Sequence, residues 1–202
     1  MLLATAALGA RRSLAAQQPQ RARLMPVGYG TLSQNDLALR IRNDDIEVRF
    51  VPLDERVLRL LAPDGYGTLR GLVTTRRAAV DSVSAQAGVS RPGIALVTFF
   101  ALRPGARYDP QTLTLQVRSR VYQPLGVVPL SSRFAGQQLE VREQASALYL
   151  FEEELPVNDS FTVSYAGLLS GDWFDKVPTL DRERGRINVR SREGQLDSAQ
   201  TR

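Results

Sequence analysis

Apolar and polar residues alternate through residues 37–50, LALRIRNDDIEVRF, which is the pattern of a β-hairpin. A two-residue turn at Asn43-Asp44 would place apolar side chains opposite each other on one face. On the other face it would place Arg40 opposite Glu47, a pair of opposite charges that stabilises a hairpin by up to about 1 kcal/mol. The pattern therefore predicts a hairpin with one buried and one solvated face.

After this hairpin the spacing of apolar residues becomes helical. Asp54 can cap a short helix that Pro63 ends. Apolar residues as far as Val83 then recur at helical spacing, and Gly88 is expected to stop this second helix. We therefore expect two inserted helices at about residues 54–87.

The stretch GYGTLRG, residues 65–71, lies between these two helices and resembles a phosphate-binding loop. Its glycine spacing departs from the dinucleotide fingerprint GxGxxG, and no parallel βαβ array is expected around it. The favoured interpretation is a turn between helices, with glycines at positive φ and Tyr66 packed beneath them. Nucleotide binding is the weaker interpretation.

From residue 94 onward the pattern is that of strands. IALVTFFAL is a continuous apolar run suited to a strand that is buried on both faces. The expected strands span residues 94–102, 112–121, 138–142, 147–152 and 160–165. With the hairpin they make about seven strands, which predicts a mainly β protein, an Ig-like antiparallel β-sandwich with the two helices inserted after the first hairpin. An α+β fold is the alternative.

The expected domain organisation follows from these elements. It comprises a leader or disordered segment at 1–16, a linker at 17–35, a single β-rich domain at 36–187 and a loose C-terminal tail at 188–202. Residues 178–187, just before the tail, are expected to be helical.

The chain begins with an apolar run, MLLATAALGA, followed by Arg11-Arg12 and a Gln-rich stretch. Small residues at Ser13 and Ala15 suit cleavage by a signal peptidase, so we expect export to the periplasm or the cell exterior. An organellar presequence and a disordered tail on a cytoplasmic protein are the alternatives. The run is far shorter than the ~20 residues that span a bilayer, so no membrane span is expected in the mature chain.

Composition excludes several classes of chemistry. The chain has no cysteine and no histidine, which excludes disulfides, thiolate zinc sites and the Ser-His-Asp triad. The net charge of +5 does not predict nucleic-acid binding, because four arginines precede the first acidic residue, Asp36, and the remaining charges are nearly balanced. No cofactor is expected.

The segment LLSGDWFDKVP, residues 168–178, is the first candidate binding site. It places Trp173 and Phe174 between Asp172 and Asp175, and exposed aromatics beside carboxylates are typical of protein hot spots and sugar-binding surfaces. The favoured alternative is that Trp173 and Phe174 plug the open end of the sandwich, because large aromatic side chains are mostly buried.

Glu152 and Glu154 form the second candidate. They lie on the same face of a strand end, where two carboxylates could bind a hard cation or act as an acid and base couple. A solvated strand end that discourages edge pairing is the favoured alternative.

Together these features favour a non-catalytic, exported binding or assembly module, such as an accessory subunit that docks on a larger envelope complex. The expected partner is another protein, with carbohydrate as the second choice and nucleic acid not expected. The alternative function is a carbohydrate-active or metal-dependent hydrolase that uses these surface carboxylates, namely Glu152, Glu154, Asp172 or Asp175.

Export predicts a new amino terminus. Mass spectrometry of the protein from its native source should find a first residue between about 14 and 18, where small residues meet the glutamines. Intact Met1 on protein from the cytoplasmic fraction would contradict this prediction.

Overall fold

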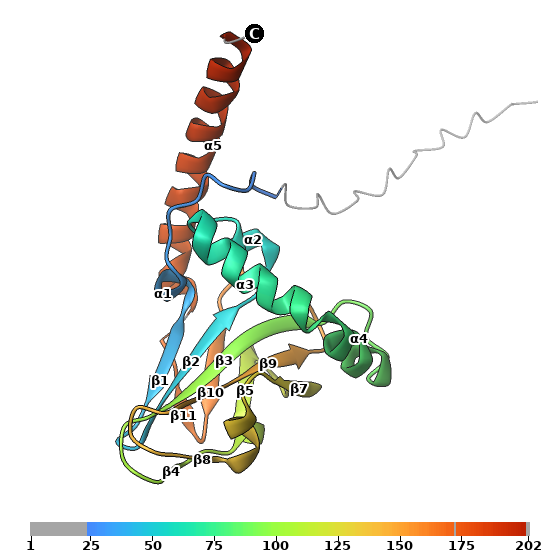
Figure 1. Ribbon diagram of the computed structural model, residues 1–202, viewed down its shortest axis with the longest axis vertical. Helices are drawn as coiled ribbons and strands as arrows, with labels where there is room; N and C mark the ends of the chain where they lie inside the picture. Colours follow the sequence, from blue (N-terminus) through green and yellow to red (C-terminus); the bar gives the residue numbers. More distant parts are fainter. Residues whose placement is uncertain (1–23, 172, 201–202) are drawn as a thin grey trace, which may run out of the picture.

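The structure, a computed structural model, describes residues 24–171 and 173–200. The expected leader at 1–16 and the candidate residue Asp172 lie outside the described residues. Figure 1 shows antiparallel sheets with helices around them, so the mainly β class is confirmed. The described part has eleven strands instead of about seven, and its sheets do not close into a barrel. None of the described helices is both long and apolar enough to cross a bilayer.

Strand β3 is the centre of the larger sheet. In spatial order this sheet contains β1 (Leu39–Arg42), β2 (Ile46–Pro52), β3 (Gly93–Ala101), β9 (Gln144–Phe151) and β7 (Gly126–Pro129). No residue of β3 is exposed, so the prediction of a strand buried on both faces is confirmed. Both faces need apolar side chains, which explains why this strand is a continuous apolar run without alternation.

The smaller sheet is held to β3 by aromatic rings. Its order is β11 (Leu168–Leu169), β10 (Thr162–Tyr165), β5 (Leu113–Val117) and β6 (Arg120–Tyr122), and a ribbon pairs β4 (Ala106–Arg107) with β8 (Gln138–Leu139). The ring of Phe99 on β3 stacks on Tyr108 with centroids 4.5 Å apart and lies 5.5 Å from the ring of Tyr165 on β10. Burial raises the pKa of Tyr108 to about 12, so its hydroxyl stays protonated and donates to the carbonyl oxygen of Phe134 at 2.9 Å.

Three helices separate β2 from β3, where two were predicted. They are α2 (Glu55–Leu58), α3 (Pro63–Thr75) and α4 (Arg77–Gln86). The other helices are α1 (Gln34–Leu37), α5 (Val177–Gln200) and the 3₁₀ helices η1 (Pro110–Thr112), η2 (Ser132–Gly136) and η3 (Trp173–Lys176). The helix expected at 178–187 is present as part of α5, which extends beyond the body of the molecule in Figure 1. The segment 188–202, expected to be a loose tail, is thus helical as far as Gln200.

The interpretation of GYGTLRG as a turn is wrong, because residues 65–71 lie inside α3 and none of its glycines has a positive φ. Pro63 does not end the preceding helix but begins α3, at a position where its missing N–H has no cost. Each glycine weakens a helix by about 1 kcal/mol. Burial of Tyr66 and Leu69 offsets this cost, because tertiary packing supplies most of the stability of a helix in a protein.

The first hairpin is present, but its turn lies one residue later than predicted. Arg40 lies opposite Arg49 instead of Glu47, and Arg49 bonds Glu47 on its own strand at 2.7 Å. The side-chain oxygen of Asn43 accepts hydrogen bonds from two backbone N–H groups of the turn, at 2.9 and 2.8 Å, and this fixes the later turn. The pairing shifts by two residues, so the apolar side chains stay on one face.

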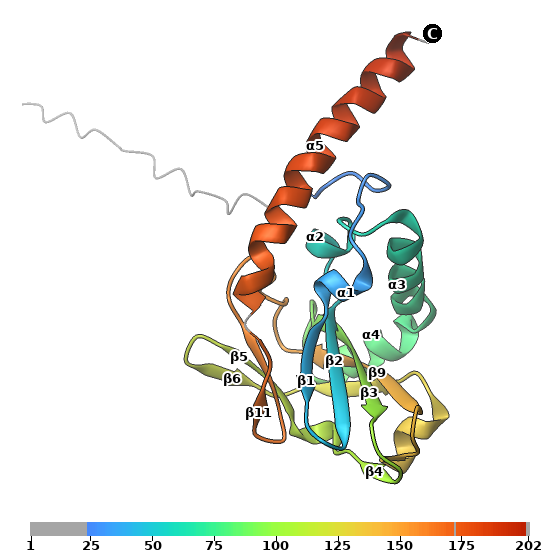
Figure 2. The ribbon, with the colours of Figure 1, turned by 90° about the vertical axis from the view of Figure 1, so that its left-hand side faces the viewer.

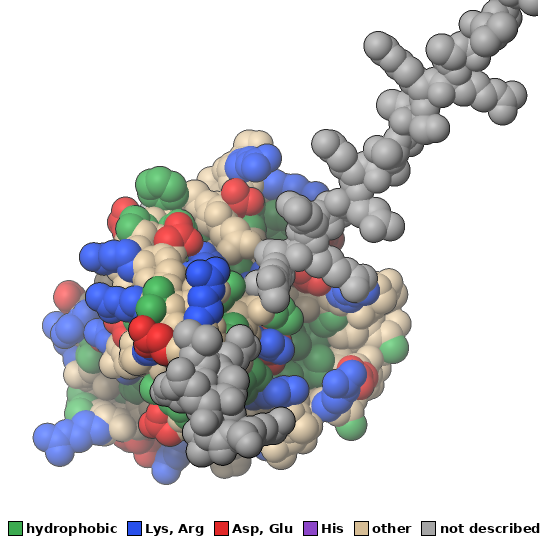
Figure 3. Space-filling model, turned by 90° about the horizontal axis from the view of Figure 1, so that it is seen from above, with side chains coloured by type: hydrophobic (Ala, Val, Ile, Leu, Met, Phe, Trp, Pro, Cys, Tyr) green, Lys and Arg blue, Asp and Glu red, His purple; other side chains and the backbone are tan. Residues whose placement is uncertain are grey.

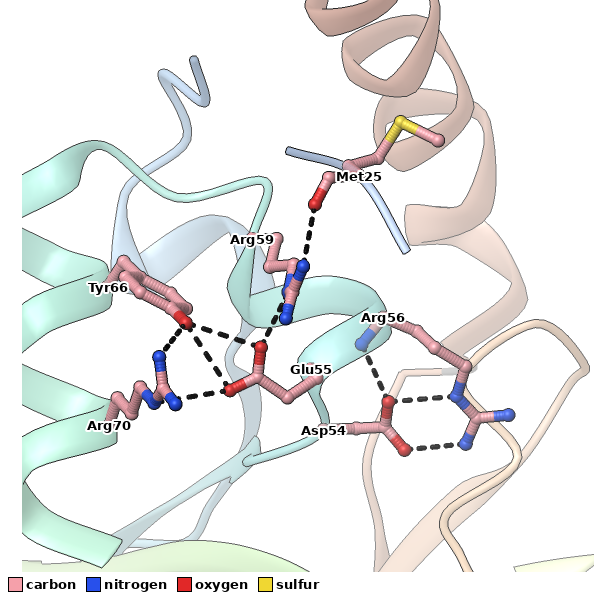
Figure 4. Close-up of polar contacts among 7 residues, drawn as sticks. All are labelled: Met25, Asp54, Glu55, Arg56, Arg59, Tyr66 and Arg70. Atoms are coloured by element: carbon pink, nitrogen blue, oxygen red, sulfur yellow. Dashed lines mark hydrogen bonds and ion pairs between the residues drawn. The ribbon is translucent and has the colours of Figure 1, made fainter. Parts of the chain in front are cut away.

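A group of polar side chains fixes α2 against its neighbours (Figure 4). Glu55 accepts a hydrogen bond from Arg59 at 2.7 Å and lies 3.7 Å from Nε of Arg70, which donates to the hydroxyl of Tyr66 at 2.8 Å. Arg59 also donates to the backbone oxygen of Met25 at 3.1 Å. These contacts join α2, α3 and the amino-terminal segment.

Residues 24–32 form a strap that runs beside α5 (Figure 2). The backbone N–H and the hydroxyl of Thr31 both donate to Oε1 of Glu183 on α5, at 2.9 and 3.0 Å. Glu183 is only 1% exposed, and Arg190 donates to the same oxygen at 2.5 Å. A buried carboxylate needs such partners, so the strap and α5 hold each other in place.

Two glycine-to-alanine substitutions should have opposite effects on the free energy of unfolding. Gly67→Ala, in the exposed middle of α3, should raise it by about 0.5–1 kcal/mol, because alanine is the better helix former and the new Cβ meets no atom within 4 Å. Gly30→Ala should lower it by about 1–3 kcal/mol, because its Cβ would lie 2.4 Å from the backbone of Leu60. Urea denaturation measures both. A destabilised Gly67→Ala would contradict the helical assignment of GYGTLRG.

Candidate docking surface on strand β11

Trp173 is completely buried, as the plug interpretation requires. Its indole N–H donates to the backbone oxygen of Val157 at 3.0 Å, and its ring stacks on Phe161 with centroids 5.0 Å apart. The backbone N–H of Trp173 also donates to the backbone oxygen of Phe161 at 2.9 Å. Trp173 therefore packs into the core, and its side chain is not accessible to a ligand.

Phe174, the next residue, was expected to be buried together with Trp173, but it is 61% exposed. Leu169 and Leu168 on β11 are 63% and 37% exposed. These three side chains, which we call the β11–η3 surface, are three of the eight exposed large hydrophobic side chains in the described residues. Leu168 and Leu169 are neighbours on one strand and therefore point to opposite faces of the sheet. Leu169 and Phe174, the two most exposed of the three, are the stronger candidates for an interaction site.

Strand β11 lies at the edge of the smaller sheet. Ala166 and Gly167 both have positive φ, 49° and 82°, and form the tight turn that pairs β11 with β10. Past the end of β11, the backbone N–H of Ser170 donates to the backbone oxygen of Val163 at 2.8 Å, and the hydroxyl of Ser170 accepts from the backbone N–H of Val163 at 3.0 Å. Within the described residues no strand other than β10 pairs with β11, so β11 is an edge strand, although β1 of the larger sheet lies near it.

Charged residues flank the β11–η3 surface on the side of β1, which lies beside β11 (Figure 2). Lys176 donates to the backbone oxygen of Asp36 at 3.1 Å. Burial lowers the pKa of Lys176, the only lysine of the chain, and the nearby Arg40 acts in the same direction. Asp175, a predicted site residue, is exposed beside Phe174. The surface therefore carries both signs of charge around an apolar centre.

The structure does not bring Glu152 and Glu154 together at one site. Glu152 bonds Arg120 of β6 at 2.7 Å, whereas Glu154 lies 3.8 Å from Arg56 of α2. Arg56 is held mainly by Asp54, with two side-chain hydrogen bonds at 2.8 and 2.5 Å (Figure 4). Each carboxylate thus faces its own arginine, and the described residues contain no group of three or more acidic side chains that could hold a metal ion.

Charge is interspersed on the end of the molecule from which α5 projects. Figure 3 shows arginines and carboxylates mixed over this face without a large area of one sign. Such a face lacks the continuous positive stripe that binds a nucleic-acid backbone.

Comparison of the chain with protein-family models, with curated proteins and with solved structures finds no match.

The sequence pattern singled out this segment for its aromatic and acidic residues and gave no weight to its two leucines. The signal was present as an apolar pair directly after Ala166-Gly167, because a short turn of this kind predicts a hairpin whose second strand begins at Leu168. The exposure of that strand depends on the absence of a neighbour, which no local pattern reveals.

Trp173→Ala should lower the free energy of unfolding by about 3–5 kcal/mol, because it removes a large buried side chain and leaves a cavity against Phe161. Thermal unfolding measures the change. In the unaltered protein the fluorescence of this single tryptophan should be blue-shifted and resistant to iodide. Red-shifted, quenchable emission would contradict its burial.

Proposed function

We propose that the chain is a non-catalytic binding or assembly module that docks on a partner protein through the β11–η3 surface. The observation that carries this proposal is the exposure of Leu168 and Leu169 on the edge strand β11 and of Phe174 on η3, which follows β11 in the chain. An accessory subunit of a larger envelope complex is the role that we favour, and export rests on the composition of the amino-terminal segment.

Docking would combine backbone and side-chain recognition. A strand of the partner can add to the outer edge of β11, where main-chain hydrogen bonds supply affinity without regard to sequence. Phe174 would then act as the anchor, because aromatic side chains that enter a pocket of the partner dominate the binding free energy. The leucines of β11 would exclude water around this anchor.

The geometry favours binding over hydrolysis. Hydrolysis of a glycoside needs two carboxyl groups that face one scissile bond across a cleft. Glu152 and Glu154 instead face arginines of different elements, and Asp175 belongs to the docking surface. For the fold we likewise propose an Ig-like sandwich, supported by the aromatic rings between the two sheets and by antiparallel pairing throughout.

Replacement of the exposed anchor should abolish docking and leave the fold intact. Phe174→Ser should weaken capture of the native partner by at least about thirtyfold, because hot-spot aromatics contribute ~2 kcal/mol or more. The partner is first identified as the protein that co-purifies with the tagged chain, and its affinity for each variant is then measured by surface plasmon resonance.

Val121→Ser is the matched control, because Val121 is a 59% exposed apolar residue of β6, at the opposite edge of the same sheet. It should bind the partner like the unaltered chain. Equal affinity of both variants, each with an unchanged melting temperature, would show that the β11–η3 surface is not the docking site.

A further inference from the structure

A groove of about 580 Å³ lies beside α4. Figure 1 shows α4 at the right of the molecule, away from β11. Its volume falls within the range of roughly 300–1,000 Å³ that small-molecule sites occupy. Apolar side chains form much of its lining, and they come from Val73, Val80, Val89, Pro92 and Ile94. Hydroxyl groups of Thr74, Ser84 and Ser90 also line it.

The path of the chain around α4 builds this groove. One side of α4 packs on β7, where a Cβ on Gly126 would lie 2.5 Å from Val83, so only glycine allows this approach. At the end of α4, Gly88 has a φ of 69° and turns the chain back, so that residues 89–92 form the far wall before β3 begins. Ser84 bonds within its own helix, since its hydroxyl donates to the backbone oxygen of Val80 at 2.8 Å.

Charged side chains lie in the lining of the groove and next to it in the chain. Arg77 lines the groove and lies 3.5 Å from Asp81, and the side chains of this pair are 78% and 65% exposed. Such a solvated pair is worth little, so an incoming anion can compete with Asp81 for the guanidinium. Arg76 and Arg91 adjoin lining residues in the chain, are exposed, and form no ion pair within the described residues. The lining itself therefore has one arginine and one acid, and two further arginines are next to it in the chain.

We propose that this groove is a second binding site, for a small amphiphilic carboxylate with a fatty-acid-like chain. The apolar chain would lie along the valine and isoleucine lining, and the carboxylate would accept two parallel hydrogen bonds from Arg77. The apolar part of the lining favours the alkyl chain of this ligand, and Arg77, with Arg76 and Arg91 next to the lining in the sequence, favours a negative head group. This site does not depend on docking at the β11–η3 surface.

Equilibrium dialysis with radiolabelled dodecanoate, below its micellar concentration, tests the proposal. The protein should bind one equivalent of dodecanoate saturably. Acetate, which lacks the alkyl chain, and dodecyltrimethylammonium, whose head group is positive, should bind far more weakly. Arg77→Gln should weaken dodecanoate binding by at least about threefold and Asp81→Asn should strengthen it, because the first removes the counter-charge and the second removes its competitor. No binding of dodecanoate, or equal binding of the cationic amphiphile, would overturn the proposal.

Two substitutions by tryptophan test whether dodecanoate binds in the groove. Ala85→Trp fills the groove from an exposed position of its lining and should weaken binding by about tenfold or more. Ser82→Trp adds the same side chain to an exposed position of α4 outside the lining and should leave the affinity unchanged. Phe174→Ser should also bind dodecanoate normally, which separates this site from the docking surface. Unaltered binding by Ala85→Trp would show that the groove is not the site.

Discussion

Burial of β3 on both faces is the constraint around which the rest of the chain is arranged. On one face Phe99 packs among the aromatic rings that join the two sheets. On the other face Ile94 lies beside α4, and the hydroxyl of Thr98 bonds that of Ser146 on β9 at 3.0 Å. An apolar strand of this kind needs a layer on each side, so the smaller sheet and the inserted helices serve the same physical requirement.

Both proposed sites lie where these layers end. The β11–η3 surface is the open edge of the smaller sheet, and the groove is the space left where α4 turns back into β3. The core beside each site is rigid, since Trp173 anchors the first and the Gly126 contact fixes the second. Such sites expose apolar groups without destabilising the fold, because the supporting residues are packed from behind.

Local pattern predicted several strands but not all of them. Residues 112–121, expected as one strand, form the hairpin of β5 and β6, with Arg118 at a positive φ in the turn. The short strands β4, β7 and β11 were not among the expected strands. Residues 94–102 were predicted correctly because this apolar run is short, rich in β-branched and aromatic residues, and flanked by Pro-Gly pairs, which favours a strand over a buried helix. GYGTLRG was wrongly predicted to be a turn because its three glycines are typical of turns. The residues that make it helical are Tyr66 and Leu69, whose burial stabilises α3 only once the core exists. Within the candidate site, the sequence located the segment but not which of its adjacent aromatics is exposed, Trp173 or Phe174.

The sequence by itself determined the class of the fold, the first hairpin with its apolar face, and the exclusion of histidine and cysteine chemistry. These follow from composition and from period-two alternation, which act over a few residues. Only the tertiary structure decided the turn at Asn43, the strap bonded to Glu183, the exposure of Phe174 and the groove beside α4. Each of these depends either on which distant segments become neighbours or on local hydrogen bonds that choose between turns of similar stability. The pattern of apolar and polar residues contains neither kind of information.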